Sequence, residues 1–143
     1  MATDKTIPRE RSAYEHFTPV TLRYSDQDPM QHINNVAITA MLESGRMHLF
    51  RAVFGDHLAE QGMVLARLNI DYLHELRFPD TVEVGGRIAK VGGRSLTSHI
   101  SVFQNDRCCI VSENVNVFFD MQTRRSTEPN RAIARVLEAY DAK

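Results

Sequence analysis

The polar run from Arg23 to Asn35 holds the residues best suited to chemistry in this 143-residue chain. It brings two carboxylates, Asp26 and Asp28, and one imidazole, His32, directly before a long apolar segment. A carboxylate can activate water, and the free N–H groups at a helix N-terminus can stabilise an oxyanion. These residue types in this order indicate an acyl-transfer site where a loop meets a helix.

The segment after this loop must position these groups. Asn34 or Asn35 is a good N-cap, and residues 36–54 continue without proline as one long helix. The first half of this helix has almost no charged face, which predicts burial on most sides. A strand over 17–24 leads into the loop, and 55–62 forms a turn or short helix.

Four segments with the period-two pattern of strands follow, at 63–73, 81–91, 94–104 and 108–119. Short connections between them favour antiparallel hairpins in a four-strand meander. The expected fold class is α+β, with an antiparallel β-sheet wrapped around one long central α-helix. We expect a mobile arm over 1–15, the domain over 16–127, and a C-terminal helix over 128–143 that packs on the domain, with Pro129 at its first position.

Composition argues against several function classes. A formal net charge of -1 gives no global field for nucleic acid or an anionic membrane, and no apolar run is long enough to span one. Cys108 and Cys109 are expected to be reduced and structural, because neighbours on a strand point to opposite faces. The six histidines lack metal-ligand spacing, so we expect no metal and no cofactor. A signal-peptide core is missing, which predicts a cytoplasmic protein.

Several motifs occur in a fixed order along the chain: Arg23-Tyr24-Ser25-Asp26-Gln27-Asp28, His32-x-Asn34-Asn35, Leu42-Glu43-x-x-Arg46, Ile70-Asp71-Tyr72-Leu73 and Val91-Gly92-Gly93-Arg94-Ser95. Together they resemble the hotdog-fold thioesterases of the 4-hydroxybenzoyl-CoA thioesterase type, over about residues 17 to 127. The resemblance implies hydrolysis of an acyl-CoA or acyl carrier protein thioester. It also implies a homodimer with active sites at the subunit interface, often paired into a homotetramer.

By position in this resemblance, the catalytic carboxylate falls on Asp28. Pro29 supports this independently, because it biases Asp28 toward an extended backbone just outside the helix. The carboxylate would act as general base toward water or as nucleophile on the thioester carbonyl, and the sequence leaves both open. The alternative is that Asp26 and Asp28 are turn and capping residues, which we prefer for Asp26, a secondary acid candidate.

Other residues of the loop have two interpretations each. His32 positions the substrate carbonyl or the water, or is a loop histidine bonded to a backbone carbonyl. The two asparagines are more readily caps than chemical groups. The oxyanion is expected to meet backbone N–H groups of Ile33, Asn34, Asn35 and Val36.

A second acid candidate lies on the helix. Related hotdog enzymes of another type carry their catalytic carboxylate there, which makes Glu43 a candidate, although we favour an intrahelical ion pair with Arg46. Asn69 and Asp71 alternate on one strand face, where they would approach the partner subunit's loop or face solvent.

Coenzyme A carries phosphates, so its binding surface should offer cations. Two clusters qualify, and solvated strand ends would look the same: Arg87, Lys90 and Arg94, and Arg124 with Arg125. Two other functions remain open for this fold. One is a dehydratase or hydratase that uses His32 with a carboxylate, and the other is an acyl-thioester binding protein without turnover.

Overall fold

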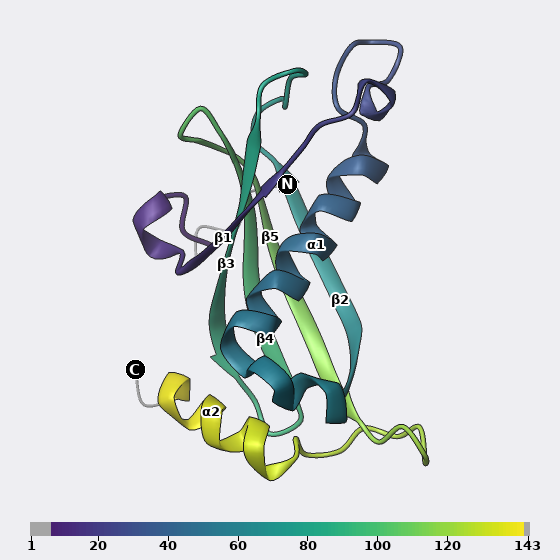
Figure 1. The fold of residues 1–143 in the computed structure, drawn as a ribbon, viewed down its shortest axis with the longest axis vertical. Helices are drawn as coiled ribbons and strands as arrows, with labels where there is room; N and C mark the ends of the chain where they lie inside the picture. Colours follow the sequence, from purple (N-terminus) through teal and green to yellow (C-terminus); the bar gives the residue numbers. More distant parts are fainter. Residues whose placement is uncertain (1–6, 142–143) are drawn as a thin grey trace.

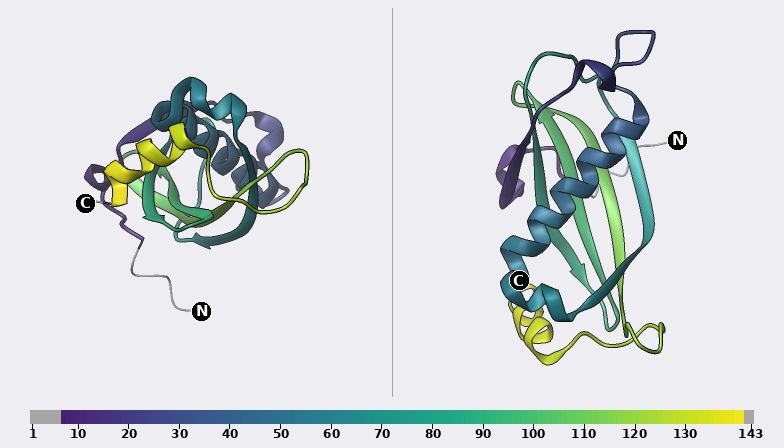
Figure 2. Two further views of the ribbon diagram at one scale, coloured as in Figure 1. Left: turned by 90° about the horizontal axis from the view of Figure 1, so that it is seen from below. Right: turned by 45° about the vertical axis from the view of Figure 1, so that its right-hand side comes forward.

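One long helix lies across a curved sheet in the computed structural model, which describes residues 7–141 (Figure 1). The helix is α1 (Asn35–Phe54), and the strands are β1 (His16–Val20), β2 (Gly62–Tyr72), β3 (Val82–Val91), β4 (Ser95–Gln104) and β5 (Arg107–Phe119). Every strand pair is antiparallel, in the order β1-β3-β4-β5-β2. The expected sheet around a central helix is confirmed, and Figure 2 shows the sheet curving around α1.

β2 does not form a hairpin with β3, contrary to the four-strand meander expected from the sequence. It pairs with β5 at the opposite edge, so only β3, β4 and β5 form a meander. The connection over 73–81 is held by Gln104 of β4, whose side chain accepts from the Arg77 N–H at 2.9 Å and donates to the Arg77 carbonyl at 2.8 Å. β2 is therefore an edge strand, with Val64 45% and Tyr72 49% exposed.

The cap of α1 explains where the helix begins. Asn34 Oδ1 accepts a hydrogen bond from the Ala37 N–H at 2.8 Å, which satisfies one of the free donors of the first turn. Farther along, Leu42, Leu49 and Phe50 face the sheet and are buried. The prediction that the first half is buried on most sides is wrong for a single chain, because Val36 remains 81% exposed. The sheet covers one side of α1 only.

Gly45 lets α1 approach the sheet closely. A Cβ at this position would clash with the Val84 side chain of β3 and crowd Ile100 of β4. We expect Gly45→Ala to lower the free energy of unfolding by about 1–3 kcal/mol through overpacking, although alanine favours helices. Urea unfolding measures this change in the free energy of unfolding. Ala52→Gly, at an exposed position of the same helix, is the control that changes helix propensity without changing the packing on the sheet. A Gly45→Ala protein as stable as the wild type would contradict this close contact.

The N-terminal segment differs from the predicted mobile arm. Its first six residues lie outside the described residues, but 7–15 pack against the face of the sheet away from α1. There Ile7 and Tyr14 are buried, and the Tyr14 hydroxyl shares a 2.6 Å hydrogen bond with Ser101 of β4. Burial raises the pKa of Tyr14 to about 12. Aromatic and apolar side chains hold this segment, a feature that its polar composition conceals.

The C-terminal helix α2 (Arg131–Asp141) lies across the lower end of the sheet in Figure 1. Asn130 caps it, because its Oδ1 accepts from the Ile133 N–H at 2.9 Å, so Pro129 precedes the helix instead of starting it. Ile133 and Leu137 are buried against the domain.

Both cysteines, Cys108 and Cys109 on β5, are free thiols, and burial raises the pKa of Cys108 to about 11.

Candidate active site

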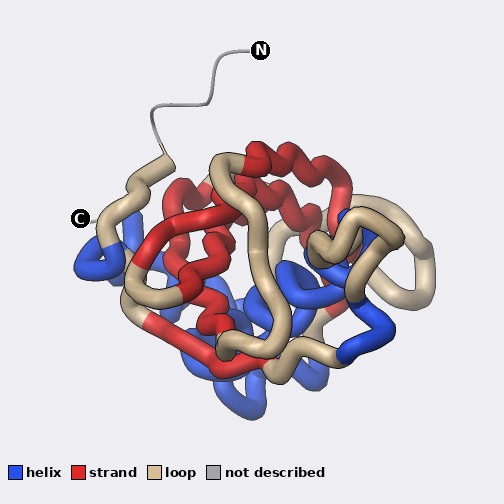
Figure 3. Tube along the Cα trace, turned by 90° about the horizontal axis from the view of Figure 1, so that it is seen from above, coloured by secondary structure: helices blue, strands red, loops and turns tan. Residues whose placement is uncertain are grey.

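A cavity of about 260 Å³ lies where the polar loop meets α1. It is lined by Asp28, His32, Ile33, Asn35, Ile38, Tyr72, Leu73, His74, Glu75, Leu76 and Ile110. Figure 3 looks onto this upper end of the molecule, where loop segments cross in front of the strands and α1. The structure thus brings the loop before α1 together with the loop after β2, which are about 40 positions apart in the sequence.

Asp28 holds the loop through one carboxylate oxygen and also lines the cavity. Its Oδ1 accepts from the N–H groups of Met30 at 2.9 Å and His32 at 3.1 Å, as expected of a turn residue. Its Oδ2 accepts no hydrogen bond from residues 7–141, and the side chain is half-buried at the cavity. One oxygen therefore fixes the loop, while the other remains available to water or substrate.

Asp26 has a structural role. Its carboxylate is 6% exposed and accepts from the Arg23 backbone N–H at 2.8 Å and from the Arg23 guanidinium at 2.8 and 3.1 Å. Its backbone carbonyl accepts from both the N–H and the side-chain amide of Asn34, each at 2.8 Å. Asp26 does not line the cavity. It therefore links the start of the loop to the cap of α1.

Replacing Asp26 with alanine is expected to lower the free energy of unfolding by about 1 kcal/mol, because the Arg23 backbone N–H and guanidinium lose their charged acceptor and the start of the loop loses its tie to the helix cap. The Arg23 guanidinium and backbone N–H hold the pKa of Asp26 below its ordinary value of 3.8. Because the folded pKa is the lower one, this stabilisation is complete above about pH 4 and is lost as the pH falls through the folded value.

Urea unfolding of Asp26→Ala and wild type between pH 7 and pH 2.5 measures both effects. The difference between the two proteins should narrow below about pH 4. The exposed neighbour Ser25 provides the control, and Ser25→Ala should unfold like the wild type. A difference that stays constant with pH would mean that the carboxylate charge is not the source of the stabilisation.

Two of the four expected oxyanion donors are already engaged. The Ile33 N–H donates to the Leu76 carbonyl at 3.4 Å, and the Asn34 N–H donates to the Asp26 carbonyl at 2.8 Å. Within the described chain, the N–H groups of Asn35 and Val36 have no acceptor. Because Asn35 also lines the cavity, its N–H is the donor best placed for an oxyanion.

His32 lies beside an acidic residue that sequence reasoning missed. Its Nε2 is 3.3 Å from Glu75 Oε2, and both side chains are partly exposed at the cavity. Tyr72 and His74, from the end of β2 and the loop after it, complete this side. Tyr72 was part of a sequence motif, whereas the only sequence signal for His74 and Glu75 was a polar stretch after a strand, because the contact with His32 depends on how the two loops fold together.

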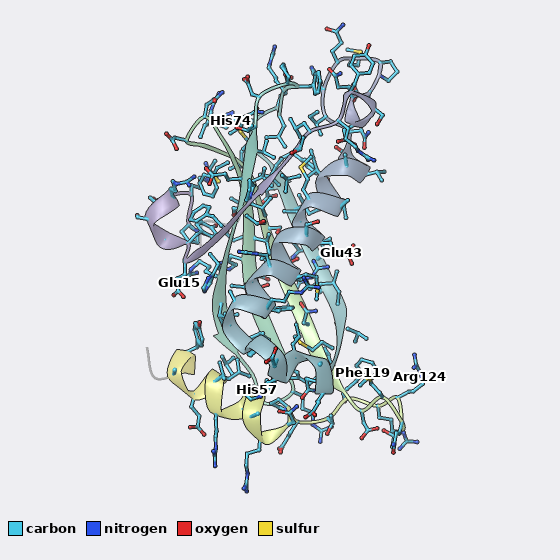
Figure 4. All side chains as sticks on the ribbon, viewed as in Figure 1. Glu15, Glu43, His57, His74, Phe119 and Arg124 are labelled. Atoms are coloured by element: carbon cyan, nitrogen blue, oxygen red, sulfur yellow. The ribbon has the colours of Figure 1, made fainter. Side chains whose placement is uncertain are left out.

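Glu43 and Arg46 belong to a neighbouring groove of about 490 Å³ between α1 and β2. The expected ion pair is present at 3.9 Å, but Arg46 is buried and donates to Asn114 Oδ1 of β5 at 2.9 Å. Burial lowers the pKa of Arg46. Glu43 itself is exposed, and Figure 4 shows it on the side of α1 toward β2. Its carboxylate does not line the Asp28 cavity.

The remaining predicted binding residues lie away from this cavity in one chain. Asn69 and Asp71 alternate along β2 with Leu68 and Ile70, which face α1, so they lie on the opposite face of the sheet. Arg87 also lies on the outer face, where its guanidinium contacts His99 Nδ1 at 2.9 Å. These three residues do not meet Asp28 within one chain.

The basic residues at the strand ends gather far from Asp28. Arg94 donates to the Ser126 carbonyl at 3.3 Å, and the Arg124 guanidinium lies 6.0 Å from the Phe119 ring centre. Figure 4 shows Arg124 at the lower end and His74 at the upper end of the sheet. Lys90 is exposed near the end of β3. One chain therefore does not bring these cations to its own cavity.

Residues 7–141 hold no group of three or more side chains placed to bind a metal ion. Neither α1 nor any other helix in the described chain has the length and apolar character needed to cross a membrane.

Comparison with known proteins places this geometry in a family. The profile of the thioesterase-like superfamily matches residues 22–137. The PA5185 protein from Pseudomonas aeruginosa superposes with a TM-score of 0.79 at 26% identity, over 92% of this chain and 96% of that one. A predicted thioesterase from Bacillus stearothermophilus gives a TM-score of 0.76 at 30% identity, over 85% and 93% of the two chains.

A thioesterase from Thermus thermophilus, solved in complex with coenzyme A and Zn, gives a TM-score of 0.76 at 26% identity, over 89% of this chain and 94% of that one. Comparison with curated proteins found no match. The similarity to these structures extends over nearly the whole chain and confirms the expected hotdog fold. The chain therefore belongs to the thioesterase-like superfamily.

Proposed function

We propose that the protein hydrolyses acyl-CoA thioesters to a free acid and coenzyme A, with Asp28 as the catalytic carboxylate. One observation carries this proposal: the Asp28 side chain and the first residue of α1, Asn35, line the same cavity. A carboxylate with an available oxygen and a helix N-terminus with an available N–H are the two groups that this hydrolysis needs.

In the general-base route, Asp28 removes a proton from water as the oxygen attacks the thioester carbonyl. The Asn35 N–H and the positive end of α1 stabilise the oxyanion that forms. The C–S bond then breaks, the proton held by Asp28 passes to the departing sulfur, and coenzyme A leaves as its thiol with release of the acid. In the nucleophilic route, Asp28 attacks the carbonyl itself and water cleaves the mixed anhydride. A single turnover in H₂¹⁸O tests the nucleophilic route, because label in the Asp28 carboxylate requires water to attack the Asp28 carbonyl of the anhydride.

Two copies of the chain pair through β2. An edge strand of 11 residues with exposed apolar side chains is a surface that isolated proteins avoid, and a second copy would cover it together with Val36 of α1. A twofold axis makes the two β2 strands antiparallel. The continued sheet then buries the exposed side of α1 that one chain leaves open.

This pairing would also bring a basic residue that is far from Asp28 in its own chain close to the Asp28 cavity of the other copy. In an antiparallel pair, the Tyr72 end of one β2 lies beside the Gly62 end of the other. Gly62 pairs with Phe119, and the loop that follows carries Arg124. Arg124 of one copy therefore comes near the Asp28 cavity of the other, where it binds phosphates of coenzyme A.

The test is release of free thiol from acyl-CoA, followed with DTNB over short, long and aromatic acyl groups and with acyl carrier protein thioesters. We expect turnover with at least one acyl-CoA class. Binding of acyl-CoA without thiol release from any of these substrates would contradict hydrolysis and favour the non-hydrolytic binding protein. Hydration of an enoyl-CoA without thiol release would favour the hydratase alternative.

A further inference from the structure

Glu75 is presented to the cavity by a firmly held part of the connection between β2 and β3. The next residue, Leu76, is 1% exposed in the core, and its carbonyl accepts from the Ile33 N–H. On the other side, Gln104 holds the backbone of Arg77. The position of Glu75 is therefore set by the core and by β4.

The loop that carries His32 is held equally well. The Asp28 N–H donates to the His32 carbonyl at 2.8 Å, and the His32 N–H donates to Asp28 Oδ1 at 3.1 Å. The two side chains thus extend from two fixed backbones and approach at 3.3 Å, between Nε2 and Oε2. Glu75 Oε2 also accepts from the Arg77 guanidinium at 3.3 Å.

This contact favours one position of the proton on the imidazole ring. A lone pair on Nε2 would face a carboxylate oxygen and be repelled by it, whereas an Nε2–H would be attracted. The contact therefore favours the Nε2–H tautomer of the neutral ring, which leaves Nδ1 to accept a proton. The other charged or titratable groups around the cavity are Asp28, Tyr72, His74 and Arg77.

We propose that Glu75 is a positioning residue for His32, fixing the imidazole as its Nε2–H tautomer at the cavity. This inference rests on the proposed function for its catalytic meaning, and it takes for His32 the first of its two sequence interpretations, orienting the substrate carbonyl or the water. Because both side chains are partly exposed, the pair contributes little to stability. Its effect lies in the orientation and tautomer of the ring, so variants of Glu75 should fold.

Long-range ¹⁵N–¹H NMR of the histidine rings tests the tautomer directly, with His32 assigned from a His32→Gln variant. At about pH 8, where an ordinary imidazole is neutral, we expect Nε2–H in the wild type. Glu75→Gln keeps an acceptor oxygen and should keep this tautomer, whereas Glu75→Leu should give a mixture. Asp80→Leu, an exposed acid in the same connection, is the matched control and should behave like the wild type.

Activity gives the second measurement. We expect Glu75→Leu to lower kcat by at least about 10-fold with KM little changed. This is part of the roughly 10²–10⁴-fold that acid–base groups contribute to catalysis. Glu75→Gln should recover part of the lost kcat. An unchanged tautomer in Glu75→Leu would overturn the proposal, as would an unchanged kcat. A wild type that cleaves no thioester but loses its tautomer in Glu75→Leu contradicts the proposed function alone, because the NMR result needs no turnover.

Discussion

Asp28→Asn is expected to lower kcat for acyl-CoA hydrolysis by about 10²–10⁴-fold, the usual contribution of a general base. Asparagine has the same shape and keeps an acceptor oxygen for the N–H groups of Met30 and His32, so the loop should retain its path. It cannot accept a proton from water or form a stable anhydride. KM should change little, because Asp28 acts on the reacting atoms.

Thiol release under saturating acyl-CoA measures this effect, and urea unfolding shows whether the variant remains folded. Asp26→Asn is the matched control, because it removes the neighbouring carboxylate without touching the cavity. It should lose stability while keeping most of its kcat once folded. If Asp28→Asn instead turned over within twofold of the wild type, Asp28 would have only its turn role.

The second large effect is expected at the edge of the sheet. If two copies pair through β2 as proposed, lysine at both Val64 and Leu65 should leave the protein monomeric, since burying unpaired charges in the proposed interface costs several kcal/mol. We expect kcat/KM to fall by about 100-fold or more, because the monomer lacks the contacts of the other copy, Arg124 included, to coenzyme A. A loss of about 3 kcal/mol in binding free energy corresponds to that factor. Size-exclusion chromatography with light scattering gives the oligomeric state, and thiol release gives the activity.

Two further experiments show whether the lost activity comes from the lost interface or from a general effect on the fold. Ala139→Lys adds a charge to the exposed surface of α2 and should remain dimeric and active. A mixture of inactive Asp28→Asn and Arg124→Glu chains should regain about a quarter of the wild-type activity after exchange, since half of the dimers are mixed and each has one intact site. No recovery would mean that Arg124 does not serve the partner's cavity.

Local chemistry made most of the fold predictable from the sequence. The cap at Asn34, the absence of proline over 36–54 and the strand periodicity act between neighbouring residues, and the structure confirms each within a few positions. The position of β2 was not predictable in this way. Sequence adjacency favours a hairpin with β3, but the contacts of Gln104 hold the connection, and β2 pairs with β5 instead.

The candidate site was predictable in part. Asp28 and His32 come from one short loop, so their spacing alone indicated a shared site, and both line the cavity. Glu75 was missed because it reaches His32 from a loop beyond β2. The cations were found as clusters, but their distance from the cavity depends on strand lengths and sheet order.

By itself, the sequence determined the residues that can do chemistry, the helix that begins beside them and the resemblance to a family, because these depend on residue type and short spacing. Only the tertiary structure decided which N–H groups stay available and that Glu75 meets His32. The physical reason is that each of these depends on hydrogen bonds and contacts whose partners are chosen when distant segments pack together.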